Sequence, residues 1–138
     1  MHHDLATLFT VFALLAAAPA LADAPAAIPD AAQTRAGVSF DAFAAKWMKK
    51  ARGLEVENRS DPTVKPGTET PLVTYRGYSD DYHVELRPTG HPSAPYVGLL
   101  RYTELVYSCR TVAAKDCSVA SSVPVTEIFR YQDGRWNY

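Results

Sequence analysis

The sequence has few cysteines and no excess of charge of either sign. Its 138 residues include two cysteines, 14 Lys and Arg, and 15 Asp and Glu. Because the formal charge is close to zero, composition gives no electrostatic reason to expect a nucleic-acid partner. The sequence also lacks a serine nucleophile elbow, a His-Glu-x-x-His zinc motif and a glycine-rich phosphate loop. We therefore predict no cofactor and no metal site.

Long apolar runs are also scarce, and the only one lies at the start of the chain. Residues 5–18 are apolar apart from Thr7 and Thr10, and this run is too short to span a bilayer. It precedes Ala20-Leu21-Ala22, the small-x-small pattern of a signal-peptidase site, although no Lys or Arg precedes the run. We expect a signal peptide over residues 1–22, cleaved before Asp23, and a periplasmic or secreted product without a membrane span. An uncleaved anchor is the alternative.

The two cysteines predict a disulfide. Cys109 and Cys117 bound a nine-residue segment, and an even cysteine count in an exported chain is typical of a structural bridge. The spacing does not match the redox Cys-x-x-Cys motif.

The first half of the expected product predicts one helix. Residues 23–38 are rich in Ala and Pro and indicate a flexible lead-in, which leaves a single domain over 39–138. Ser39 is the expected N-cap. From Phe40 to Ala51 the apolar residues recur at helical spacing, and the helix could continue to Asn58. Its lysines fall mostly off the apolar stripe, which favours a solvated face over a basic binding patch.

The remainder predicts antiparallel strands. Period-two alternation, turn residues and prolines define the boundaries, with a turn expected at Ser79–Asp81 and a hairpin at Asp133-Gly134. The expected strands are 72–78, 82–87, 96–110, 119–131 and 135–138. We predict an α+β fold in which one N-terminal amphipathic helix packs on a curved four- to five-stranded antiparallel sheet.

The last hairpin carries a family resemblance. The segment Ile128-Phe129-Arg130-Tyr131-Gln132-Asp133-Gly134-Arg135-Trp136, together with the helix-then-sheet order, resembles cystatin-like domains, including the nuclear-transport-factor-like and SnoaL-like families. SnoaL-like enzymes hold acidic and histidine side chains in a cavity between helix and sheet. No matching pair can be placed in this sequence, so the resemblance implies a fold and no catalytic residues.

Strand alternation suggests one binding site. If the disulfide joins the two longest strands, odd-numbered residues of both strands share a face, unless a bulge intervenes. Arg101 and Glu127 are charged residues within apolar rows on that face, near Tyr107 and Tyr131. The hypothesis that follows is that Arg101 and Glu127 form a charge pair in or at the rim of the helix–sheet groove. The alternative is an exposed pair at a sheet edge.

The opposite face of the same strands is too apolar to be left wholly in water. It would hold a row that includes Leu100, Tyr102 and Ile128. Either the lead-in covers this face or a second copy does, so we predict a homodimer through the sheet.

Two further polar groups have ordinary explanations. Asp80, Asp81 and His83 resemble an acid–base group, but they fit a polar turn entering a strand better, and they lack the ligand pattern of a calcium loop. His91 lies in a proline-rich loop and is interpreted in the same way.

The sequence favours an exported, non-catalytic binding or protein-interaction module, whose partner is a protein or a small molecule that the sequence does not name. One alternative is a small SnoaL-like enzyme that holds a polar substrate with Arg101, Glu127, Tyr107 or Tyr131. Another is an envelope adaptor protein.

Overall fold

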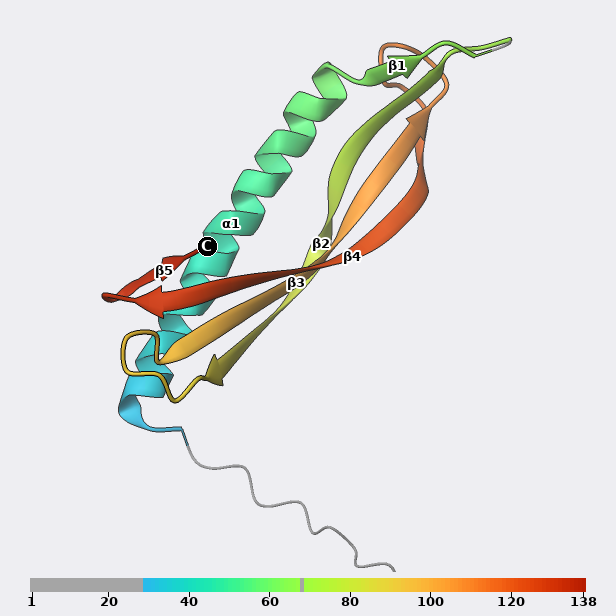
Figure 1. The fold of residues 1–138 in the computed structure, drawn as a ribbon. Coiled ribbons are helices and arrows are strands. Elements are labelled where there is room, and N and C mark those ends of the chain that lie inside the picture. The colour runs from blue at the N-terminus through green and yellow to red at the C-terminus, as the bar shows by residue number, and fades with distance from the viewer. Residues whose placement is uncertain (1–28, 68) are drawn as a thin grey trace, which may run out of the picture.

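The computed structural model describes residues 29–67 and 69–138, so the predicted signal peptide and its cleavage site lie outside the described residues. The elements are α1 (Ala31–Ser60), β1 (Thr63–Lys65), β2 (Leu72–Pro88), β3 (Tyr96–Cys109), β4 (Cys117–Gln132) and β5 (Arg135–Asn137). The strands form one antiparallel sheet in the order β1-β2-β3-β4-β5, and α1 lies along it (Figure 1). The predicted α+β fold is confirmed. Within the described ranges, no helix is both long and apolar enough to cross a membrane.

The helix starts earlier than predicted. Its N-cap is Asp30, whose carboxylate accepts a hydrogen bond from the backbone N–H of Gln33 at 2.6 Å. The expected N-cap at Ser39 is therefore wrong, and so is the flexible lead-in where it overlaps α1. Ser39 lies inside the helix, where its hydroxyl donates to the Ala36 carbonyl and accepts from the Trp136 indole N–H at 3.0 Å. Ser39, a residue type that favours helix N-caps, therefore links α1 to β5 through its side chain.

The main core forms where the first half of α1 meets the sheet. Phe40, Ala44 and Met48, spaced four residues apart, are buried against Leu100 of β3 and Phe129 of β4. This confirms the predicted apolar stripe. Because burial of large side chains is the main favourable term in folding, this cluster anchors the helix.

A glycine permits the closest approach of helix and sheet. A Cβ atom at Gly98 of β3 would lie 2.4 Å from the ring of Phe40, so any larger residue would force the two elements apart. Phe40 therefore packs directly on the β3 backbone.

A second, smaller core lies at the other end of the sheet. Val73, Tyr75, Cys109 and Ala114 are buried there. The predicted disulfide between Cys109 and Cys117 is confirmed, with Cα atoms 4.0 Å apart, and it closes the β3–β4 loop. Arg59 near the end of α1 donates to the Ala114 carbonyl at 3.4 Å, which links the helix to this loop.

β2 is one continuous strand. The predicted turn at Ser79–Asp81 is wrong, because these residues form an irregularity at which the pairing with β3 shifts between Tyr78 and Tyr82. The Ser79 hydroxyl accepts a hydrogen bond from the Thr103 N–H at 3.1 Å, so this segment stays attached to β3.

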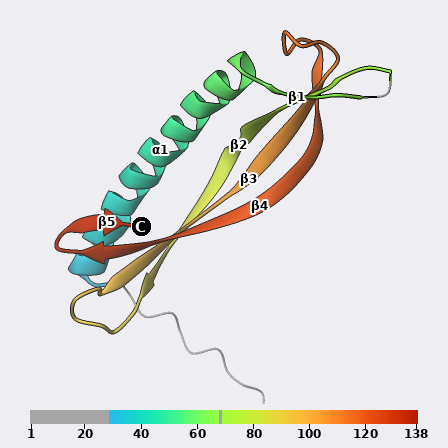
Figure 2. The ribbon, with the colours of Figure 1, turned by 45° about the horizontal axis from the view of Figure 1, so that its top comes forward.

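The sheet is strongly twisted. The main core uses Leu100 and Tyr102 of β3, whereas Tyr107 and Cys109 belong to the second cluster. Residues an odd number of positions apart point to opposite faces of a strand, so the two clusters lie on opposite faces of β3. Figures 1 and 2 show the three long strands turning about one another along the straight helix.

The apolar row that motivated the predicted homodimer does not remain open. Leu100 and Tyr102 are buried in the core formed with α1, so the helix covers them and no second copy is needed. Ile128 pairs with Leu99, so it lies on the other face of the sheet, and it is 56% exposed. The face expected to form the homodimer is therefore covered by α1, and the homodimer itself stays a prediction.

We predict opposite effects when alanine replaces two glycines. Gly98→Ala should lower the free energy of unfolding by about 2 kcal/mol, because the added methyl group overlaps the Phe40 ring. Gly53→Ala, in the interior of α1 with no atom near the new methyl, should raise it by about 0.5 to 1 kcal/mol. Urea denaturation followed by tryptophan fluorescence measures both. Equal effects at the two positions would contradict the close packing at Gly98.

Candidate functional site

The predicted charge pair does not form. The β3–β4 register pairs Leu100 with Glu127 and Arg101 with Thr126, so Arg101 and Glu127 point to opposite faces of the sheet. The cause is one extra residue in β4, Ala120, at which the pairing shifts. A single-residue bulge reverses the face of every later side chain relative to the partner strand.

Arg101 instead pairs with β2. Its guanidinium bonds Glu85 at 2.7 Å, and Arg87 bonds the other oxygen of the same carboxylate. The hydrogen bonds from Arg87 and then Arg101 lower the pKa of Glu85 from 4.5 to about 2. This outward-facing cluster is an ion-pair network between neighbouring strands.

Glu127 lies on the face that α1 covers. Its carboxylate accepts hydrogen bonds from the hydroxyls of Tyr102, at 3.2 Å, and Tyr138. Burial, and then the charge of Glu127, raises the pKa of Tyr102 to about 12. Tyr102 therefore stays protonated and acts as a hydrogen-bond donor.

The two predicted tyrosines lie in different places. Tyr107 stacks on Tyr75 with ring centroids 4.7 Å apart, near the second core. Tyr131 packs against Trp136 at 4.9 Å, at the other end of β4. The four predicted binding residues are therefore not brought into one site.

The other polar groups have local partners. Asp80 lies 3.4 Å from Arg52 of α1. The ring of His91 contacts the Ser93 hydroxyl at 2.9 Å within their loop. Asp80 therefore lies within β2 in a surface ion pair and not in a turn, whereas His91 fits the interpretation of a polar loop residue.

The last nine residues of α1 meet the sheet differently from the rest of the helix. After Ala51 no residue of the helix is buried. Contact is made instead by two polar side chains: Glu55 accepts from the Tyr78 N–H at 2.9 Å, and Asn58 donates to the Arg76 carbonyl at 3.0 Å. These main-chain groups of β2 point away from β3, so this end of the helix runs along the edge of β2.

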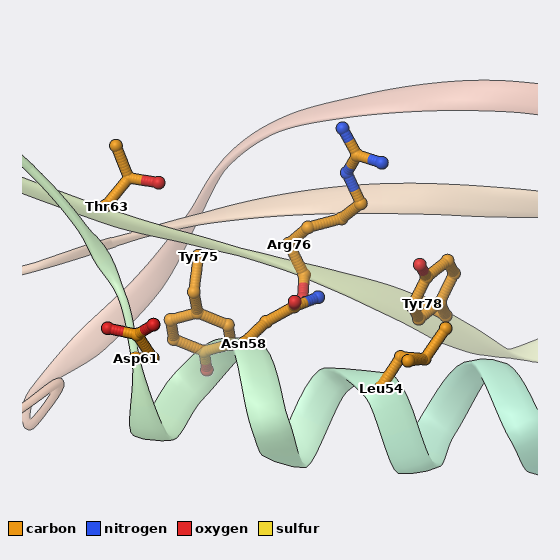
Figure 3. A pocket seen from close by; sticks show the side chains of 7 residues that line it. All are labelled: Leu54, Asn58, Asp61, Thr63, Tyr75, Arg76 and Tyr78. Carbon is orange, nitrogen blue, oxygen red and sulfur yellow. The ribbon is translucent and has the colours of Figure 1, made fainter.

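A pocket of about 330 Å³ opens beside these contacts. In Figure 3, Tyr75 extends from β2 toward α1, Tyr78 lies on β2 above Leu54, and Asn58 rises from the helix between the two tyrosines. The guanidinium of Arg76 points away from the helix and bonds Glu104 at 2.9 Å. The lining residues are Leu54, Asn58, Asp61, Thr63, Tyr75, Arg76 and Tyr78.

A second pocket of about 150 Å³ shares Leu54 and Tyr78 with the first. Its other lining residues are Trp47, Lys50, Ala51 and Tyr102. We call the two pockets together the α1–β2 groove. Along the helix it runs from Trp47 to Asp61, about 20 Å at the rise of an α-helix.

Sequence reasoning missed this groove. The strand order alone does not show that α1 reaches the edge of β2. The available clue was Leu54, an apolar residue that continues the stripe beyond Gly53 among charged neighbours. It is 41% exposed, consistent with a groove wall rather than a core position.

Comparison with known proteins reveals no relative of this chain. The chain matches no protein-family model, and no curated protein or solved structure is significantly similar to it.

The polar attachment of α1 should contribute to stability. Glu55→Ala leaves the partly buried Tyr78 N–H without its acceptor, so the free energy of unfolding should fall by about 1 to 2 kcal/mol. Glu57→Ala, an exposed acid on the same helix, should change it by less than about 0.5 kcal/mol. Urea denaturation at neutral pH compares the two variants. Indistinguishable results would show that the Glu55 contact does not hold the helix.

Proposed function

We propose that this protein is an exported binding module whose ligand occupies the α1–β2 groove. The observation that carries the proposal is the groove itself: it combines aromatic rings and neutral polar groups with three charged residues, Lys50, Asp61 and Arg76. Ligand sites are typically concave, with apolar walls and a few polar groups that fix orientation. At about 330 Å³, the larger pocket is at the lower end of the usual range.

Export is part of the same proposal. The signal-like leader supports it, and so does the Cys109–Cys117 bridge, because disulfides persist mainly in oxidising compartments. The helix on a curled antiparallel sheet is also the architecture that the cystatin-like resemblance implies, and that relationship stays a proposal.

Binding is favoured over the enzyme alternative by one finding. The SnoaL-like interpretation relied on Arg101 and Glu127 holding a substrate together, and these residues lie on opposite faces of the sheet. Arg101 and Glu127 therefore do not form the substrate-holding pair that this enzyme would need. The adaptor alternative requires a protein partner, which the experiment below separates from a small ligand.

The test maps binding onto the oxidised protein, expressed with its leader and purified from the periplasm. The ¹⁵N-labelled chain is titrated with a panel of neutral saccharides, amino acids, carboxylates, quaternary ammonium salts and short peptides. We expect at least one class to shift the amide signals of Leu54, Asn58 and Tyr78. Leu54→Arg, which fills both pockets, should abolish those shifts.

The matched control is Val56→Arg, which places the same side chain on the same helix at a position 67% exposed and outside the groove. It should bind as the unmodified protein does. Shifts confined to the opposite sheet face around Ile128, or equal loss in both variants, would refute the groove as the site.

A further inference from the structure

We propose that the α1–β2 groove binds a segment of a linear, neutral polysaccharide. This inference rests on the proposed function and adds the chemical class of the ligand. It follows from the charge of the groove, from its hydrogen-bonding groups, and from what already occupies the edge of β2.

The charges at the groove oppose an ionic ligand. Asp61 lies at one end and Lys50 at the other, eleven residues apart and so about 16 Å along the helix. An anion in the larger pocket would face Asp61 without a balancing cation, because Arg76 points away and is paired with Glu104. A compact cation would gain little from Asp61, since an exposed carboxylate is well solvated. A neutral ligand avoids both costs.

The polar groups of the larger pocket suit a polyol. Thr63, Tyr75 and Tyr78 line this pocket and carry hydroxyls, and Asn58 carries an amide; all of these groups can donate and accept hydrogen bonds. Asn58 uses one of its two N–H groups on the Arg76 carbonyl, which leaves the other N–H and the amide oxygen. Asp61 accepts strong charge-assisted bonds from hydroxyl donors. A sugar ring carries several hydroxyls that match such mixed groups.

The smaller pocket suits the apolar face of a sugar ring. It is walled by Trp47, Tyr78 and Tyr102, with the stem of Lys50 and the side chain of Leu54 beside them. Tyr102 commits its hydroxyl to Glu127, so its ring acts here as an apolar surface. A chain of sugars has polar rims and apolar faces, and it can use both pockets in succession because Tyr78 and Leu54 belong to each.

A peptide strand is the less favoured occupant. Strand addition requires free main-chain groups at a sheet edge. At this edge Asn58 occupies the Arg76 carbonyl and Glu55 occupies the Tyr78 N–H. An extended peptide would have to displace two contacts that hold the helix.

The experiment titrates the oxidised protein with tetramers of N-acetylglucosamine and of glucose, and in separate arms with choline and with an uncharged extended tetrapeptide. Binding is followed by ¹⁵N chemical shifts and by calorimetry. We expect a tetrasaccharide to bind at about 1 mM or tighter and to shift Asn58 and Tyr78. A long-chain glycan in the same assay distinguishes a polymer from a free saccharide.

Two variants test the chemistry. Asp61→Ala and Tyr78→Phe should each weaken tetrasaccharide binding by about tenfold, because each removes one hydrogen-bonding group. Asp41→Ala and Tyr82→Phe change the same residue types outside the groove and should leave the affinity unchanged.

An incorrect ligand class and an incorrect binding site would give different results in this experiment. Shifts at Asn58 and Tyr78 caused by choline or the tetrapeptide, with none from any saccharide, would overturn the polysaccharide inference and leave the groove as a binding site. No shift at these residues from any arm, together with binding elsewhere, would overturn the proposed function as well.

Discussion

The fold depends on how far a straight helix can follow a twisted sheet. α1 is 30 residues long, whereas the sheet turns steadily because strands of L-residues have an intrinsic right-handed twist. The two surfaces match over the first half of the helix, where Phe40 packs on the backbone at Gly98. Beyond Ala51 the sheet presents its edge, and apolar burial along the helix stops.

Where α1 no longer faces the sheet, its polar side chains bond main-chain groups of β2 that would otherwise lack partners. At the edge of β2, main-chain groups lack a neighbouring strand beyond the three residues paired with β1. Unpaired backbone groups at a partly buried position cost free energy. Glu55 and Asn58 supply one acceptor and one donor there, much as a strand would. Because a side chain and its hydrogen bond together reach farther than the roughly 4.8 Å between neighbouring strands, the helix stands off the sheet, and the α1–β2 groove occupies the space that remains.

Sequence patterns predicted the features that are set locally. The spacing of Phe40, Ala44 and Met48 fixes the buried face of the helix, and the pairing of Cys109 with Cys117 follows from their count and spacing. The helix start also had a local signal, since Asp30 is followed by Gln33 three residues later as in a capping box. It was missed because the apolar periodicity was followed only from Phe40.

The features set by tertiary packing were not predictable in this way. The extra residue in β4 falls in a run of Ser, Ala and Val that is compatible with a regular strand, and it separates Arg101 from Glu127. The groove depends on the twist of the whole sheet and on the place where α1 leaves its face. No single segment carries that information, so candidate residues such as Tyr78 and Asp61 emerged only from the structure.

α1 is anchored by burial as far as Ala51 and by polar edge contacts beyond it. Native-state hydrogen exchange of the α1 amides tests this most directly, because protection reports the free energy of local opening. We expect high protection around Ala44 and Met48, and a marked decrease after Ala51 toward Ser60. Uniform protection along the whole helix would contradict it.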